Sequence, residues 1–463
     1  MSRDPFRNLP SHGAGCGGDP SFAVSRVRVQ SLPDPRPVTG RNGAVRAIPV
    51  LARLAGFLRR AGIAPGSALR PKMTFAICAL LLACLFIPAV ALAETTLTIG
   101  HVQLKKDRTY GKSRTFAQYL MQPLGRPWDG AKVALEEVKW HGAAAGVAFD
   151  LDRERVSKPS AVADTIRQMV AERGIRFFLL DLPSDVMAEA TQALRGDNVL
   201  LFNVSSRSDL LRGAACQPNL LHIMPSHAML ADALGQYLVF KRWTEVLLLT
   251  GPLDEDKAWA DAFRRTAGRF GLDIDAERDF VLSNDPRIRE QNNPVLLTSG
   301  ADYDAVVVMD TDGEFARNLN YRIRDARPIV GAEGLAPLAW HWAWERHGAP
   351  QLESRFQQNA GRPMRDVDWA AWLAVKTVAE AVQRTGQADF AALRDYITGP
   401  DLVLDGFKGN RLNFRPWDGQ LRQPVLLATH NWVVERAPVE GFLHKTNNLD
   451  TLGHDERDSA CER

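Results

Sequence analysis

The chain has 463 residues, with 57 lysines and arginines against 54 aspartates and glutamates. This positive balance comes from the N-terminal part, because residues 1–93 carry 12 basic and 3 acidic side chains, whereas 94–463 carries 45 basic and 51 acidic ones, a net charge of −6. Such a balance gives no electrostatic reason to expect nucleic acid as a partner. The 370 residues from 94 onward are enough for two domains of ordinary size or one large domain.

Residues 1–72 are rich in arginine, proline and glycine and show no sustained hydrophobic periodicity. A segment of this composition cannot bury a core. We therefore expect either a disordered leader or untranslated sequence that precedes a later start.

An apolar run from Phe75 to Ala93 follows, with two basic residues before it and Ala-Leu-Ala at its end. This arrangement is typical of a secretory signal peptide, which we place at 73–93 with cleavage after Ala93. A retained membrane anchor is the main alternative, and lipidation of Cys84 is a weaker one. The strand-like sequence that follows the run, without a basic flank, favours cleavage.

From residue 94 on, short apolar runs alternate with amphipathic helical stretches. Several runs are apolar at consecutive positions, as strands covered on both faces must be. This alternation predicts an α/β fold with a doubly wound parallel sheet, and the length of the chain predicts two such lobes. The predicted strands are TLTIGHV from 96, GVAFDLD from 146, IRFFLLD from 175, NVLLFNV from 198, EVLLLTG from 245 and DAVVVMD from 304.

The last third of the chain is less regular. A Trp-rich stretch precedes a long helix predicted from about Asp366 to Thr385, and a strand pair with a Trp-Asp-Gly turn is predicted from Arg411. Residues 437–463 are polar and are expected to form a flexible tail. Cys216 and Cys461 are the cysteines that remain after residue 93, and in an oxidising compartment they can pair.

Four passages, in this order and spacing, resemble the type I periplasmic binding proteins of the branched-chain amino acid kind, the receptors of ABC importers. They are TLTIGHVQL, PWDGAKVALEEV, the long passage from FNVSSRSD to LADALGQYL, and PIVGAEGL. The chain also resembles, by overall likeness, the subgroup associated with the pyrroloquinoline-quinone (PQQ)-dependent alcohol dehydrogenase system. The resemblance covers roughly residues 95–436.

The resemblance implies two α/β lobes joined by a hinge, which close on a small ligand between them. By analogy, lobe one comprises 94–225 with 337–398, and lobe two comprises 226–336 with 399–436. The implied location is the periplasm, and the implied partners are a small-molecule ligand and an ABC permease in the inner membrane. A PQQ-dependent dehydrogenase is a second candidate partner.

Binding positions in the first lobe follow from matching the motifs of that family. Ser184 in DLPSD stands at a helix N-terminus, where it can receive a carboxylate or act as a simple N-cap. In VSSRSD, Ser205 and Ser206 match small residues that hold the ligand. Arg207 departs from the pattern. It can bind a carboxylate with two hydrogen bonds, block the usual amino acid pose, or pair with Asp209 on the surface.

Three positions in the second lobe complete the candidate ligand site. Trp259 matches an aromatic position and can cover an apolar ligand face, or can belong to the core. Asp312 replaces another aromatic position, together with Thr311, so stacking on that side is lost. Glu333 matches an acid that binds an amino group. The departures at Arg207 and Asp312 argue against leucine-like ligands.

Other patterns carry little chemistry. A calcium loop that begins at Asp310 would need a bidentate glutamate at its twelfth position, where the chain has Tyr321, so an EF-hand is excluded. The acidic run at 254–256 is typical of the first turn of a helix. We expect no metal, no cofactor and no enzymatic activity, since no nucleophile motif is present. The alternative function is an accessory protein that transports nothing and docks with the dehydrogenase, for which the candidate surface is an exposed apolar patch around residues 340–344.

Overall fold

The computed structural model describes residues 95–111, 124–143, 145–281, 283 and 285–462. The leader predicted at 1–72, the signal peptide predicted at 73–93 and its cleavage site after Ala93 lie outside these residues. In the part of the chain that is described, every helix is too short or too polar to cross a bilayer.

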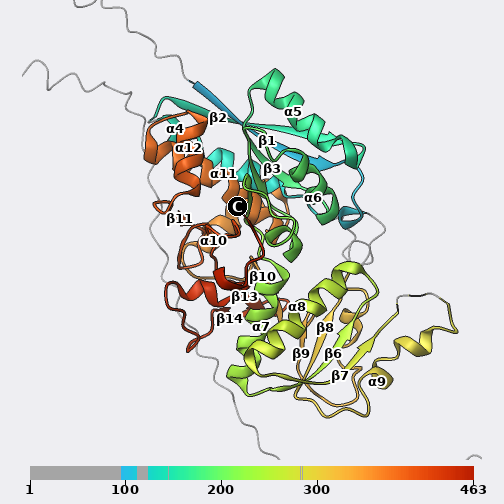
Figure 1. Ribbon diagram of the computed structural model, residues 1–463. Coiled ribbons are helices and arrows are strands. Elements are labelled where there is room, and N and C mark those ends of the chain that lie inside the picture. The colour runs from blue at the N-terminus through green and yellow to red at the C-terminus, as the bar shows by residue number, and fades with distance from the viewer. Residues whose placement is uncertain (1–94, 112–123, 144, 282, 284, 463) are drawn as a thin grey trace, which may run out of the picture. The chain divides into compact units, whose positions relative to one another are not determined.

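The first lobe contains a five-stranded parallel sheet in the order β2-β1-β3-β4-β5 (Figure 1). Its central strand β3 is buried along its whole length, as the continuous apolar run predicted. Because the strands are parallel, their carboxyl ends and the loops that follow share one edge of the sheet. The strands are β1 (Thr95–Leu104), β2 (Val147–Val156), β3 (Phe177–Asp181), β4 (Leu200–Asn203) and β5 (Leu220–His222).

The second lobe contains a four-stranded parallel sheet in the order β7-β6-β8-β9. Two parallel sheets with crossover helices confirm the predicted α/β fold. The sequence analysis missed β7, an edge strand whose residues are alternately exposed and half-buried and which is too polar to stand out as an apolar run. The strands are β6 (Glu245–Thr250), β7 (Asp273–Asp279), β8 (Ala305–Met309) and β9 (Ile329–Gly331).

Helices cover both sheets. In the first lobe they are α4 (Trp128–Ala143), α5 (Val162–Arg173), α6 (Ser184–Ala193), α10 (Ala349–Ala360), α11 (Asp366–Thr385) and α12 (Phe390–Thr398). In the second lobe they are α7 (His227–Lys241), α8 (Asp254–Phe270) and the short α9 (Pro294–Leu297). The observed bounds of α11 are the predicted ones.

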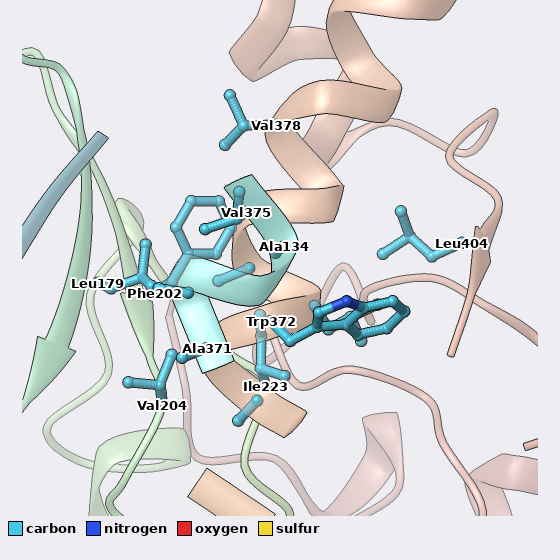
Figure 2. Packing of buried hydrophobic residues seen from close by; sticks show 14 of the residues in the cluster. Ala134, Leu179, Phe202, Val204, Ile223, Ala371, Trp372, Val375, Val378 and Leu404 are labelled. Carbon is cyan, nitrogen blue, oxygen red and sulfur yellow. The ribbon is translucent and has the colours of Figure 1, made fainter. Parts of the chain in front are cut away.

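Helices α4 and α11, which are far apart in the sequence, pack against each other on one face of the first sheet. Gly130 makes this approach possible, because a Cβ there would lie 1.9 Å from the carbonyl oxygen of Asp368. Figure 2 shows Trp372 and Val375 of α11 and Ala134 of α4 beside Leu179 and other strand residues. The first core is therefore closed by a helix supplied from the last quarter of the chain.

The chain crosses between the lobes after β5, after β9 and before β13. A third, antiparallel sheet, β10-β13-β14, lies at these crossings. Along β13, Leu426 packs in the core of the first lobe, whereas Val425 and Leu427 pack in the core of the second. Alternate side chains of one strand thus connect the two cores. The strands are β10 (Ala336–Leu338), β13 (Val425–Ala428) and β14 (Val433–Ala437).

Two assignments in the region 399–436 need correction. Leu404 in β11 (Leu404–Asp405) and Leu412 in β12 (Arg411–Leu412) pack in the core of the first lobe, not the second (Figure 2 shows Leu404). The predicted strand pair closes only around its turn, where the Arg422 N–H donates to the Asn413 carbonyl over 2.8 Å. Farther out its arms separate, since β12 pairs with β11 and β13 pairs with β10 and β14.

The prediction of a flexible tail at 437–463 is wrong for the described residues. Leu449 and Leu452 are buried, and buried Asp450 accepts hydrogen bonds from the guanidinium groups of Arg415 and Arg422. A disulfide joins Cys461 to Cys216, which settles the pairing that the sequence left open. The polar composition was misleading because these polar side chains are used for internal hydrogen bonds.

Candidate functional site

The loop after β4 is shaped by the buried side chain of Asn203. Its carbonyl oxygen accepts from the N–H groups of Ser205 and Ser206 over 3.2 and 2.8 Å, and its amide donates to the Ser206 carbonyl. The Ser205 hydroxyl both donates to the Leu182 carbonyl and accepts from the Leu182 N–H, each at 3.1 Å. Ser205 therefore fastens the β4 loop to the β3 loop, and its hydroxyl is committed to the backbone.

Ser184 lies beside this junction, as the first residue of α6. The residue at the N-cap position is Pro183, and no side chain caps the helix. The interpretation of Ser184 as an N-cap was wrong. The half-buried Ser184 side chain stays a candidate for ligand contact at a helix start.

Arg207 follows the two serines and forms an ion pair with Asp366 at the start of α11. The suggested pairing with Asp209 is wrong, because the Asp209 carboxylate instead accepts from the N–H of Ala228 in the first turn of α7. Asp366 also accepts from the Trp340 N–H over 2.9 Å. Arg207 is thus held by a carboxylate from a helix about 160 residues away, a partner that the local sequence could not identify.

Trp259 of α8 is buried, with 5% of its surface exposed, and packs in the core of the second lobe. Its indole stacks with the His227 ring at a centroid distance of 6.0 Å and an interplanar angle of 16°. The pKa of His227 is lowered to about 4, mainly by burial; the Asp209 charge opposes this shift, and the Arg207 charge adds to it. The stacked rings of Trp259 and His227 form a neutral aromatic wall near Arg207. Trp259 is a core residue of the second lobe, and this packing does not depend on a ligand.

Asp312, in the loop after β8, forms an ion pair with Arg108 in the loop after β1. This contact joins the carboxyl-end loops of the two lobes. Glu255, at the start of α8, is exposed, yet the surrounding protein raises its pKa, with Arg207 opposing and Asp312 adding to the increase. Arg207, Glu255 and Asp312 therefore lie within electrostatic range of one another.

Glu333 accepts a 3.2 Å hydrogen bond from the Asn320 amide. It follows Gly331, whose φ of 110° and whose position close to the Val308 carbonyl admit no side chain. The strand end is therefore built around glycine. Glu333 therefore lies in the loop after β9, with Asn320 as a hydrogen-bond partner.

The acidic residues of the second-lobe loops have structural partners. Asp310 accepts from the N–H groups of Gly313, Phe315 and Ala316 at 3.0, 2.8 and 2.9 Å. Buried Asp256 accepts from the N–H groups of Leu253 and Thr311. Among the described residues, no three acidic, histidine or cysteine side chains are grouped to bind a metal ion.

The sequence analysis missed a group of polar residues in the first lobe. The Asp181 carboxylate, at the end of β3, accepts from the Tyr110 hydroxyl over 2.7 Å and pairs with Arg126 at 3.3 Å. Burial raises the pKa of Asp181 to about 7, although both partners oppose this shift. The available signal was an aspartate that ends an otherwise apolar strand, FFLLD.

Two surface hollows lie elsewhere. One is lined by residues of 438–449 with Asn410 and Arg436, and the other by residues of 403–411 with His347, Glu380 and Arg384. Neither is lined by any of the seven predicted site residues. The candidate site is therefore defined by contacts between loops and not by these hollows.

The comparisons agree with this architecture. The family model described as periplasmic binding protein matches residues 120–326. No curated protein matches the sequence.

Three solved structures illustrate the likeness in fold. A branched-chain amino acid ABC transporter periplasmic ligand-binding protein from Burkholderia xenovorans has 12% identity and a TM-score of 0.58, over 73% of this chain and 95% of that one. The branched-chain amino acid transporter substrate-binding protein of Streptococcus pneumoniae, in complex with isoleucine, has 19% identity and a TM-score of 0.55, over 74% and 99%. A solute-binding protein from Rhodopseudomonas palustris, in complex with 3,4-dihydroxybenzoic acid, has 12% identity and a TM-score of 0.55, over 72% and 93%.

Proposed function

Since the resemblance to type I periplasmic binding proteins is confirmed by the family model and by the shared fold, we propose that this chain is an extracytoplasmic solute-binding protein of an ABC importer. It captures a small polar or amphipathic ligand between its two lobes and presents it to a permease in the inner membrane. Binding, and not turnover, is the role proposed. The implied location is the periplasm, after cleavage behind Ala93.

The ion pair between Arg108 and Asp312 is the observation that carries this proposal. It joins loops at the carboxyl ends of two separate parallel sheets, the edge at which open α/β sheets bind ligands. A solute that contacts both loops would favour the closed arrangement, because binding energy can shift a hinge only through contacts that differ between its states. The candidate contacts are Ser184, Ser206 and Arg207 from the first lobe, with Asp312 and Glu333 from the second.

Trp259 and Ser205 are proposed in narrower roles. Trp259 forms an aromatic wall with His227, and Ser205 keeps the β3 and β4 loops in register. The departures at Arg207 and Asp312 argue against a simple branched-chain amino acid. The relatives that carry isoleucine and 3,4-dihydroxybenzoic acid show that this fold accepts carboxylates of different shape.

Native mass spectrometry of the protein taken directly from cells is the decisive test. We expect a retained solute of small mass, and we expect addition of that solute to raise the melting temperature in proportion to the logarithm of its concentration. A chain that carries no solute, and whose melting temperature is unchanged by small acids, amino acids and sugars, would contradict the proposal. N-terminal sequencing of the exported protein tests the cleavage after Ala93.

An accessory protein that docks with a PQQ-dependent dehydrogenase is the second candidate. The exposed patch predicted around residues 340–344 does not support it, because Trp340 and Trp344 are buried and only Trp342 is exposed. Trp344 donates from its indole N–H to the Phe407 carbonyl over 2.9 Å, so it serves the packing of the first lobe. Co-purification with the dehydrogenase would support this second candidate function.

A further inference from the structure

The C-terminal segment 447–461, which we call the C-terminal strap, contacts both lobes. On the first-lobe side it meets the turn at 413–422. This turn belongs to the first lobe, because the His222 N–H donates to the Gly419 carbonyl over 2.9 Å and Leu421 packs in the first core. On the second-lobe side the strap meets α7, whose buried residues pack in the second core.

Buried charges fasten the strap to the first lobe. Asp450 is fully buried and accepts hydrogen bonds from the guanidinium groups of Arg415 and Arg422, at 2.8 and 2.9 Å. Arg415 also donates to the Leu449 carbonyl over 3.1 Å. Breaking a buried ion pair is costly, because each charge is left unpaired in the interior. Movement of the strap away from the 413–422 turn would therefore be strongly unfavourable.

Hydrogen bonds and apolar packing fasten the same strap to the second lobe. The amide of Gln236, in α7, donates to the Thr451 hydroxyl over 3.1 Å. The Arg269 guanidinium, in α8, donates to the Gly453 carbonyl over 3.0 Å, and Leu452 packs in the second core. The strap is therefore part of the packing of both lobes.

One peptide group of the strap bridges the two lobes. The Leu452 carbonyl accepts from Arg415 of the first lobe over 2.7 Å, and the adjoining Gly453 N–H donates to Asp232 of α7, also over 2.7 Å. These two groups belong to the same rigid, planar peptide unit and point in opposite directions. Both side-chain partners are buried. A rotation that separates Arg415 from Asp232 therefore breaks one of the two bonds.

Gly453 makes this bridge possible. Its φ is 84°, in the left-handed region, where other residues are strained. A Cβ at this position would also lie 2.8 Å from Cγ of Met229 in α7. A side chain at position 453 would therefore displace the bridging peptide.

A covalent bond holds the end of the strap. The disulfide joins Cys461 to Cys216, in the loop before β5 of the first lobe, across a sequence separation of 245 residues. Disulfides persist in oxidising compartments. The strap is thus attached covalently to the first lobe at its end, while its middle part is bound to both lobes.

We propose that the C-terminal strap is a fourth connection between the lobes and that it restrains their rotation about the three crossings of the chain. A rotation that carries α7 away from the 413–422 turn must release the strap from one of them. The disulfide and the buried charges oppose release from the first lobe. This restraint acts on the lobes themselves and does not depend on the identity of a solute.

The test measures the distance between the lobes in the full chain without added solute. Nitroxide labels are attached to p-acetylphenylalanine introduced in place of Gln168 in α5 and of Lys257 in α8, which are both exposed. Double electron–electron resonance then gives the distribution of distances between the labels. The label chemistry avoids cysteine, so the disulfide stays intact.

Two variants release the strap by independent routes. Cys216→Ser combined with Cys461→Ser removes the covalent attachment, and Gly453→Ala displaces the bridging peptide but keeps the disulfide. We expect both to broaden the distance distribution, about twofold for the double variant. Circular dichroism verifies the fold of each.

Arg362→Gln is the matched control. Arg362 forms ion pairs with Asp129 and Asp368, which both lie in the first lobe. This variant should lose stability but keep the wild-type width. Broadening in either strap variant without broadening in the control supports the proposal. It is overturned if neither strap variant broadens the distribution, or if the control broadens it as much.

Native mass spectrometry separates this inference from the proposed function. A chain that retains no solute, but whose distance distribution broadens when the strap is released, contradicts the receptor function and supports the strap. A chain that retains a solute, but whose distribution is the same in the strap variants as in the wild type, supports the receptor function and overturns the strap.

Discussion

Acidic and basic residues gather at the carboxyl ends of both parallel sheets, but the two lobes use them differently. In the second lobe, the carboxylates of Asp256 and Asp310 accept hydrogen bonds from backbone N–H groups and so fix the loops after β6 and β8. In the first lobe, His101, Gln103 and Arg365 bury polar atoms that have no hydrogen-bond partner within the part of the chain that the structure describes. The comparison teaches that residue type at a loop position does not distinguish a structural from a binding role, whereas hydrogen-bond satisfaction does.

The largest expected effect concerns the second lobe, where carboxylates accept hydrogen bonds from backbone N–H groups. Asp310→Ala removes three charge-assisted bonds to backbone N–H groups and leaves these groups unpaired, so we expect the free energy of unfolding to fall by about 3 kcal/mol. Urea denaturation followed by circular dichroism measures it. Asp279→Ala, at an exposed position in β7, is the control and should change the stability by less than about 0.5 kcal/mol. Equal losses in the two variants would show that the Asp310 contacts do not hold the loop.

An intermediate effect concerns pH and the buried His101 of β1. Burial, together with the charges of Arg153 and Arg126, lowers the pKa of His101 to about 3. Below pH 6.5 the unfolded chain binds a proton at this histidine while the folded chain does not, so folded stability falls as the pH drops from 6.5 toward 3. The slope from this group is about 1.4 kcal/mol per pH unit.

His101→Gln should remove that part of the pH dependence. Urea denaturation at pH 7, 6, 5 and 4.5 measures the slope for the variant and the wild type. His430→Gln, at an exposed histidine, should keep the wild-type slope. An unchanged slope in the His101 variant would mean that His101 is already protonated in the folded protein.

The smallest expected effect concerns an exception in the second lobe, the indole N–H of Trp259, which is buried and has no hydrogen-bond partner among the residues that the structure describes. Trp259→Phe loses packing but no hydrogen bond. Trp369→Phe, the matched variant in the first lobe, also loses the 3.1 Å bond to the Gly406 carbonyl. We expect the second variant to lose about 1 kcal/mol more stability than the first, measured by thermal and urea denaturation. Equal losses would mean that the Trp259 N–H has a partner in solution.

The sequence by itself determined the architecture of this protein. Continuous apolar runs at β3, β6 and β8 identify strands covered on both faces, and the face formed by Trp372, Val375, Ala379 and Val382 identifies α11. These signals are local, since burial of a strand or helix imposes its period on the residues of that element alone. The same locality explains why β7 was missed and why the C-terminal segment was wrongly predicted to be flexible. β7 is a polar edge strand, and the C-terminal segment is polar in composition although several of its residues are buried.

Only the tertiary structure decided which site residues are available to a ligand. From the sequence, Arg207 was interpreted as a ligand contact or a partner of Asp209, and it is paired with Asp366. Arg365 was not singled out from the sequence; its side chain is half-buried, and one terminal nitrogen has no hydrogen-bond partner among the described residues. The physical reason is that charge compensation is a matter of distance in space, and the helix α11 that brings these partners enters the first lobe from the far end of the chain. The sequence identified the residue types at the strand ends, but it did not identify their hydrogen-bond and ion-pair partners.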